Sequence, residues 1–179
     1  LELPPYRVPR IGQVIVRSVL DRTLHVLGRA AAVAAPWGLA VYALANISAG
    51  GETLLSWFCS WLDPAARLIG LDGVILAAFV LGLPANELVI PIMLMAYTSG
   101  SCLTEISSYA ALSEVLSGNG WTAMTAVSAV LFTLMHSPCS TTLLTIKKET
   151  GSIGWTAAAA VIPTAAGIGL LAVLNCIFG

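Results

Sequence analysis

Charged side chains are scarce in this chain of 179 residues. Only 9% of its residues are Asp, Glu, Lys or Arg and 58% are hydrophobic, whereas soluble domains carry about 25% charged residues. Residues 115–146 and 151–179 contain no charged residue at all. Each of these segments covers the ~20 residues that a helix needs to cross a bilayer. The composition excludes an ordinary soluble domain and indicates an integral membrane protein.

The chain also lacks a basic excess, closely spaced cysteines and a signal peptide, and each absence excludes a class of protein or site. The net charge is −1, so the chain lacks the basic excess that marks nucleic-acid-binding proteins, and no nucleic-acid partner is expected. Its four cysteines have no CxxC spacing, which argues against a zinc site or a disulfide framework. No signal-peptide pattern stands before the body of the chain, which we expect to be a piece of a longer protein.

Four apolar stretches predict the helices of a membrane domain. They are residues 24–47, 73–98, 121–146 and 155–178. We therefore expect residues 23–179 to form an all-α, polytopic membrane helical bundle. Residues 1–22 are proline-rich and then amphipathic and basic, which predicts a helix at the cytoplasmic interface. Residues 53–70 are apolar but short, and Asp63-Pro64 should interrupt them, so we expect an interfacial or shallow re-entrant helix there.

Two of these stretches contain residues that break a helix. Gly82-Leu-Pro-Ala-Asn-Glu87 lies near the middle of one stretch, and Ser137-Pro138 interrupts another. Proline removes a backbone donor and clashes with the preceding turn, and in hydrocarbon the freed groups need new partners. Broken spanning helices are typical of transporters, where they line a polar cavity. We expect the breaks to meet near the bilayer centre; their residues are Pro84, Asn86, Ser137 and Pro138.

The positive charges predict the orientation in the membrane. Five of the eight lysines and arginines lie within the first 29 residues, and Lys147 and Lys148 lie between the last two stretches. The positive-inside rule places both groups in the cytoplasm, so an even number of crossings must separate them. Either residues 53–70 also cross, or residues 73–98 fold back as a re-entrant hairpin. We prefer the hairpin, because it also explains the break, and the carboxyl terminus then lies outside.

Glu87 is a candidate site residue beside the first of these breaks. It is the only carboxylate of its stretch, and an ionisable group at membrane depth is a functional candidate by default. The alternative is that Glu87 caps the second half-helix, where the free N–H groups and the helix dipole favour an acid. The two roles can coexist.

His136 and Cys139 are candidates beside the second break. They are three residues apart, so on a continuing helix they would face one side. Imidazole and thiolate suit a borderline metal such as ferrous iron, and methionine sulfur can assist; the nearby methionines are Met93, Met95 and Met135. The alternative is that Cys139 is a small buried residue and that His136 hydrogen-bonds to a neighbour.

The remaining polar residues of this region have expected structural roles. The hydroxyls of Ser140, Thr141 and Thr142 would satisfy backbone groups freed by Pro138. Lys147-Lys148-Glu149 should be a solvated helix end. No tightly bound metal or cofactor is expected, because a permeating ion needs loose sites with few ligands.

Three motifs run along the chain in a recognisable order. They are Glu2-Leu-Pro-Pro-Tyr-Arg-Val-Pro9, Gly82-Leu-Pro-Ala-Asn-Glu-Leu-Val-Ile-Pro91 and Pro138-Cys-Ser-Thr-Thr-Leu-Leu-Thr-Ile-Lys-Lys-Glu-Thr150. Together they resemble the membrane part of the bacterial ferrous iron transporter B family. The resemblance implies the carboxy-terminal, gate-like half of an inner-membrane permease for Fe(2+), with Cys139 matching the family's Pro-Cys motif. Many members have Ala-Lys-Glu where this chain has Ala85-Asn86-Glu87, so a role for a lysine there does not carry over.

The resemblance also implies partners. Members of the family carry a GTP-binding domain and a first gate-like half ahead of this part. The phosphate-binding loop Gly-x-x-x-x-Gly-Lys-Ser/Thr is absent here, so this segment is not expected to be an enzyme. Its expected partners are the lipid bilayer, the rest of the transporter or a second copy of the chain. Two other functions stay open: a carrier of another solute such as a nucleoside, and a membrane assembly module that transports nothing.

Overall fold

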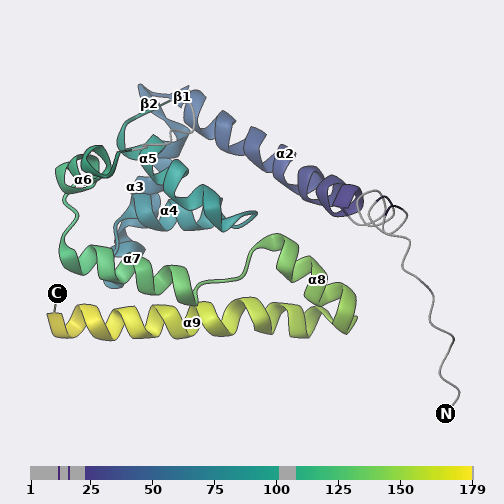
Figure 1. Ribbon diagram of the computed structural model, residues 1–179. Coiled ribbons are helices and arrows are strands. Elements are labelled where there is room, and N and C mark those ends of the chain that lie inside the picture. Colours follow the sequence, from purple (N-terminus) through teal and green to yellow (C-terminus); the bar gives the residue numbers. More distant parts are fainter. Residues whose placement is uncertain (1–11, 13–15, 17–22, 101–107, 179) are drawn as a thin grey trace, which may run out of the picture. The chain divides into compact units, whose positions relative to one another are not determined.

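The computed structural model describes residues 12, 16, 23–100 and 108–178, and this part of the chain is almost entirely helical (Figure 1). A short antiparallel pair, β1 (Ser48–Ala49) and β2 (Glu52–Thr53), follows the first long helix. The helices are α2 (Leu24–Asn46), α3 (Leu54–Leu68), α4 (Gly73–Leu81), the 3-10 helix η2 (Asn86–Leu88), α5 (Val89–Tyr97), α6 (Tyr109–Gly118), α7 (Ala123–Met135), α8 (Ser140–Thr150) and α9 (Ile153–Phe178). The predicted all-α membrane fold is confirmed, while the segment predicted at 1–22 lies almost wholly outside the described residues.

Three segments of the described chain are long and apolar enough to cross a membrane. They are Val26–Asn46, Ala123–Thr150 and Ile153–Phe178. These segments correspond to the first, third and fourth predicted stretches, and they make the chain a multi-pass membrane protein. The chain divides into two compact units, Leu1–Pro36 and Trp37–Gly179, and the contacts described below all lie within the second.

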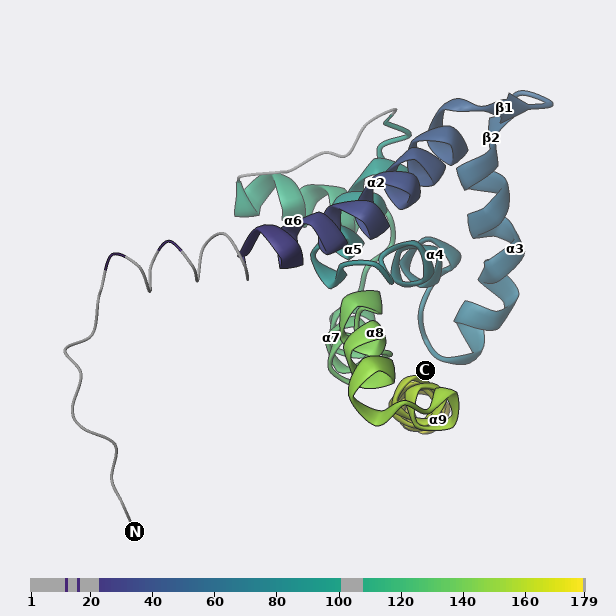
Figure 2. The ribbon, with the colours of Figure 1, turned by 90° about the vertical axis from the view of Figure 1, so that its right-hand side faces the viewer.

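Helices α3 and α4 meet at a sharp bend of 109° (Figure 2). Gly73 opens α4, and a β-carbon there would lie 2.1 Å from the carbonyl oxygen of Cys59. The helices can approach this closely only because residue 73 has no side chain. The Gly73 N–H donates to Oδ1 of Asp63 (3.0 Å), and Asp72 caps α4 by accepting from the Ile75 N–H (2.7 Å).

One expectation about α3 is wrong. Asp63-Pro64 was expected to interrupt the segment, but α3 continues through Pro64 to Leu68. The missing proline N–H costs the helix one backbone hydrogen bond, whereas the Asp63 side chain ties α3 to the next helix through the Gly73 N–H. At 15 residues, α3 is shorter than the ~20 residues of a full span.

Residues 73–98 fold back on themselves. After the break that follows Leu81, α5 returns and packs against α4. The Tyr97 hydroxyl at the end of α5 donates to Oδ2 of Asp72 at the start of α4, and the Trp121 indole donates to the Tyr97 oxygen (2.8 Å). Both ends of the stretch therefore lie together. The predicted fold-back is confirmed, while the number of membrane crossings between the two positive groups stays a prediction.

The core of the second unit forms around this hairpin. Ile75 and Ile92 are each 1% exposed, and the Phe79 ring of α4 meets the Phe132 ring of α7 edge-on, with centroids 4.8 Å apart. Helix α9 runs beside both α7 and α8 (Figure 1). Its outer side chains are apolar and exposed, as contact with lipid requires.

Helix α8 ends as the sequence predicted. Lys147 and Lys148 occupy its exposed last turn, where the helix dipole favours positive charge. Gly151 follows with φ of +64°, a left-handed conformation that ends many helices and that glycine adopts without strain. The exposed helix end is confirmed, while its contact with water stays a prediction.

The required glycine at the α3–α4 bend can be tested by Gly73→Ala. The added methyl group would overlap the Cys59 carbonyl, and overpacking of this kind costs about 1–3 kcal/mol or more. We expect a lower thermal unfolding midpoint for the purified protein in detergent. Gly118→Ala is the matched control, because nothing lies within 4 Å of a β-carbon there. Equal midpoints for Gly73→Ala and the parent would contradict the packing described.

The orientation can be tested by labelling single cysteines in intact cells. Residues 99–120 carry no lysine or arginine, so we expect this loop outside the cell and the loop with Lys148 in the cytoplasm. A membrane-impermeant thiol reagent should therefore label Ala110→Cys and should not label Lys148→Cys. Both proteins should be labelled once the cells are permeabilised. Strong labelling at 148 with none at 110 would mean that the orientation is inverted.

Candidate functional site

Both predicted helix breaks are present. The first break comprises residues 82–85, between the end of α4 at Leu81 and the start of η2 at Asn86. The second break comprises residues 136–139, between the end of α7 at Met135 and the start of α8 at Ser140. The chain therefore crosses each break in a non-helical conformation, and each break contains one of the two prolines, Pro84 and Pro138, that predicted it.

The two breaks are hydrogen-bonded to each other. The Ser140 N–H, the first of α8, donates to the carbonyl oxygen of Leu83 (2.9 Å), and the Ser140 hydroxyl donates to the carbonyl oxygen of Pro84 (3.4 Å). Helix starts carry N–H groups without intrahelical partners, and in hydrocarbon each unsatisfied group costs several kcal/mol. The second break thus supplies the hydrogen-bond donors, and the first break supplies the carbonyl acceptors. The expected meeting of the breaks is confirmed, while their depth in the bilayer stays a prediction.

Two further contacts fix the first break. The Trp37 indole donates to the carbonyl oxygen of Leu81 (2.6 Å). A β-carbon on Gly82 would lie 2.5 Å from a methyl group of Val89 and 2.8 Å from the carbonyl oxygen of Ala78. Residue 82 must therefore be a glycine for the chain to turn this tightly between the two half-helices.

The hydroxyl groups after the second break have partners other than those expected. The Ser140 hydroxyl donates to the Pro84 carbonyl oxygen in the first break. The hydroxyls of Thr141 and Thr142 lie 3.1 and 3.2 Å from the Cys139 sulfur. The expectation that all three repair the backbone around Pro138 is wrong. The reason is that α7 has already ended at Met135, so Pro138 interrupts no continuing helix.

Cys139 stands at the start of α8. It is the capping residue, with φ of −58° and ψ of 157°, and its side chain is half-buried. A helix amino terminus favours negative charge, and the two threonine hydroxyls can donate to the sulfur. The position therefore suits a thiolate that is reachable from outside the core.

His136 lies in a different environment. It is 8% exposed, and its ring centroid lies 5.0 Å from that of Phe79 and 6.0 Å from that of Phe132. Nδ1 lies 3.1 Å from the carbonyl oxygen of Thr133, as the alternative interpretation expected for this side chain. Nε2 is buried without a hydrogen-bond partner in the described structure, an arrangement that is rare in proteins.

The spacing argument for a joint site of His136 and Cys139 does not apply. It assumed a continuing helix, but α7 ends at Met135 and His136 has extended geometry, with ψ of 173°. His136 packs among aromatic rings, whereas the Cys139 sulfur faces threonine hydroxyls.

Glu87 lies in η2, and two of the three methionines, Met93 and Met95, lie in α5, whereas Met135 directly precedes His136. Glu87 is exposed in η2 and makes no hydrogen bond or ion pair with the described residues, so it stands in the first turn without acting as a side-chain cap. Met93 and Met95 are buried in α5, 5% and 1% exposed. Across residues 23–100 and 108–178, no three His, Cys, Asp or Glu side chains gather closely enough to hold a metal ion.

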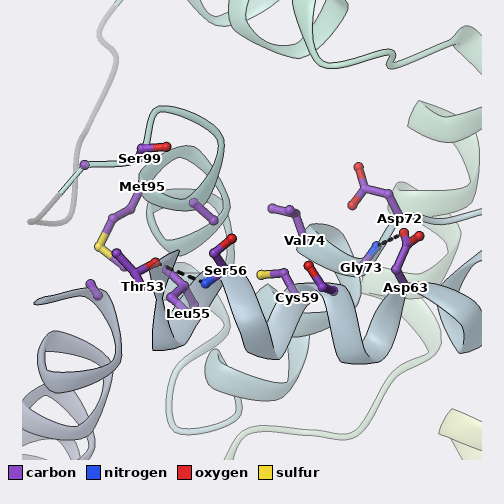
Figure 3. Close-up of a pocket in the computed structure, with 14 residues that line it drawn as sticks. Thr53, Leu55, Ser56, Cys59, Asp63, Asp72, Gly73, Val74, Met95 and Ser99 are labelled. Atoms are coloured by element: carbon purple, nitrogen blue, oxygen red, sulfur yellow. Dashed lines mark hydrogen bonds between the residues drawn. The ribbon is translucent and has the colours of Figure 1, made fainter. Parts of the chain in front are cut away.

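Sequence reasoning missed a polar cavity of about 330 Å³ lined by residues of α3, α4 and the end of α5 (Figure 3). The signal was present in the sequence. Ser56, Cys59, Ser60 and Asp63 recur at helical spacing along one face of an otherwise apolar segment.

Comparisons with known proteins agree with the fold. The model of the Gate family, described as nucleoside recognition, matches residues 18–153. The protein "Fe(2+) transporter FeoB" of Staphylococcus aureus is 28% identical over 170 residues, which cover 91% of this chain and 24% of that protein. The proteins of the same name from Methanocaldococcus jannaschii and Synechocystis are also 28% identical, over 87% and 91% of this chain. The chain spans about a quarter of the length of these relatives. No solved structure matches it.

The contact between the breaks can be tested by Ser140→Pro. Proline is tolerated at the first position of a helix, and the extended conformation of Cys139 is the one that precedes proline. The helix should survive, but the N–H that reaches Leu83 is lost and the ring carbon takes its place, so the breaks must part. We expect destabilisation of about 1–3 kcal/mol, the cost of leaving a buried polar group unsatisfied.

The matched control is Ser140→Ala, which removes only the longer hydroxyl bond. It should lower the thermal unfolding midpoint less than Ser140→Pro does. Parental stability of the Ser140→Pro protein would show that the breaks do not depend on each other.

Proposed function

The chain belongs to the Gate family, and from this we propose that it forms part of the path through which a bacterial inner-membrane transporter moves ferrous iron. The observation that carries the proposal is the direct hydrogen bonding of two broken helices through Ser140. Paired broken helices are how transporters build an ion site inside a bilayer. We choose ferrous iron as the ion because the chain is similar, over 91% of its length, to proteins named as Fe(2+) transporters.

The junction offers suitable ligands for such an ion. The carbonyl oxygens of Leu83 and Pro84 are already directed at the junction, and the Cys139 sulfur belongs to the neighbouring residue. Oxygen and thiolate donors together suit a borderline cation such as Fe(2+).

The three candidate residues would then act at separate points. Cys139 contacts the ion at the junction. His136, with a buried nitrogen that lacks a partner, and Glu87, exposed beside the first break, would each act with groups supplied by other parts of the transporter. Iron is the cargo in this proposal, and no resident cofactor takes part.

The rest of the path must come from outside this chain. Because the chain spans about a quarter of the length of its relatives, we propose that it works with the remainder of a transporter, including a GTP-binding domain and a first gate-like half, or with a second copy of itself. This segment would not be an enzyme. Any nucleotide hydrolysis would belong to the partner domain.

One observation favours a second candidate. The Gate family model is described as nucleoside recognition, and a broken-helix junction can bind an organic solute. Comparing the uptake of ferrous iron with that of a nucleoside by the complete transporter separates the two. Iron uptake without nucleoside uptake supports the ferrous path, and the reverse result replaces it.

Cys139→Ser tests the thiol directly. The change keeps the size and polarity but replaces a soft ligand with a hard one. In the complete transporter we expect ferrous uptake to fall several-fold with unchanged expression. Cys176→Ser, at an exposed position of α9, is the control and should transport as the parent does. Uptake at the parental rate in Cys139→Ser would make the thiol structural, and a non-transporting assembly role would then gain support.

A further inference from the structure

Helix α3 carries its serines beside a cavity that opens to the surface. Trp57 and Trp61 are 64% and 65% exposed, which suits lipid and the membrane interface. The buried residues of the helix are Leu55, Cys59 and Ala66. Ser56 and Ser60 are exposed and line the cavity, so their hydroxyls lie where the cavity meets its surroundings.

Polar side chains line the cavity both from α3 and from the residue before α4. Figure 3 shows Ser56, Cys59 and Asp63 along one face of α3, with Asp72 and Val74 of the next segment facing them. The volume is about 330 Å³, which is room for about ten water molecules at ~30 Å³ each. An ion with an octahedral shell of six waters would therefore fit.

The charges around the cavity favour a cation. Asp63 is paired with Arg67 (Oδ2 to Nε, 2.7 Å), but the Asp72 carboxylate has no cationic partner among the described residues. It accepts only from the Ile75 N–H and the Tyr97 hydroxyl. Among the described residues, no lysine, arginine or histidine lines the cavity. One negative charge is therefore left unbalanced at its wall.

A buried thiol at the cavity points to the class of cation. Cys59 is 6% exposed, borders the cavity, and makes no side-chain hydrogen bond in the described structure. Figure 3 shows its sulfur beside Ser56 and near Val74. A thiol is a poor ligand for calcium or magnesium and a good one for a transition metal.

We propose that this cavity is a second cation site, which holds a hydrated divalent transition-metal ion between α3 and the start of α4. Asp72 supplies the charge, Cys59 the soft donor, and the α3 hydroxyls face the water shell. The site lies at the end of the hairpin opposite the first break, about 13 Å away along the 9 residues of α4. Resting on the proposed function, this ion is the cargo, held before it reaches the junction of the breaks.

The first experiment uses Mn²⁺ as the probe and the purified complete transporter. Asp72→Asn removes the unbalanced charge but keeps a good helix cap, and Glu114→Gln removes a charge from exposed α6 as the matched control. Titration of free Mn²⁺ by electron paramagnetic resonance should show several-fold weaker binding at one site for Asp72→Asn and parental binding for Glu114→Gln. Parental binding by a folded Asp72→Asn protein overturns the proposal.

A second measurement needs no substitution. Saturating Mn²⁺ should slow the reaction of Cys59 with a small cationic thiol reagent and should leave the rate at Cys176 unchanged. An unchanged rate at Cys59 overturns the site even where the Asp72→Asn protein fails to fold.

The uptake of ferrous iron separates this proposal from the proposed function. For the same transporter, Asp72→Asn should raise the half-saturating iron concentration several-fold and leave the maximal rate nearly unchanged, as expected for a site that collects ions. If the parent takes up no iron but Mn²⁺ still protects Cys59, the cation site stands and the ferrous path fails. If the parent takes up iron and Mn²⁺ protects nothing, the second site alone fails.

Discussion

The hydrogen bonds from Ser140 to the carbonyls of Leu83 and Pro84 are the interaction on which the rest of the structure depends. A bilayer offers no water to an interrupted helix, so each break would carry polar groups that nothing satisfies. Joined, the breaks become compatible with the membrane. The same junction fixes the start of α8 and so places Cys139 beside the backbone of the first break. The same hydrogen bonds therefore stabilise the fold and position the proposed ion site.

The hairpin of α4 and α5 holds the first break in position at the junction. At one end, Gly82 allows the tight turn of the first break. At the other end, Asp72, Tyr97 and Trp121 form a chain of hydrogen bonds that closes the hairpin. The hairpin thus connects two polar regions through an apolar core. On the proposed function, it links a cavity that collects cations to the junction where they pass.

Much of this arrangement could be predicted from the sequence, for physical reasons. Scarce charge and proline positions predict spans and breaks because the bilayer penalises charge and unsatisfied backbone. The parity of crossings between the two positive groups left two arrangements, and the break at Pro84 favoured the fold-back of residues 73–98 that the structure has. The partner of Ser140 could not be predicted, because it lies 56 residues away. The helical spacing of His136 and Cys139 does not apply, because α7 stops before Pro138. The α3 cavity was overlooked because Pro64 was taken as the end of a helix that continues.

The central claim is that a ferrous ion passes where the two breaks meet. The most direct test is a solved structure of the complete transporter with iron bound, in which anomalous scattering identifies the metal. The account predicts iron density within coordination distance of the Cys139 sulfur or of the carbonyl oxygens of Leu83 and Pro84. Iron density on a path that touches neither break, with the Ser140 contacts intact, would contradict it.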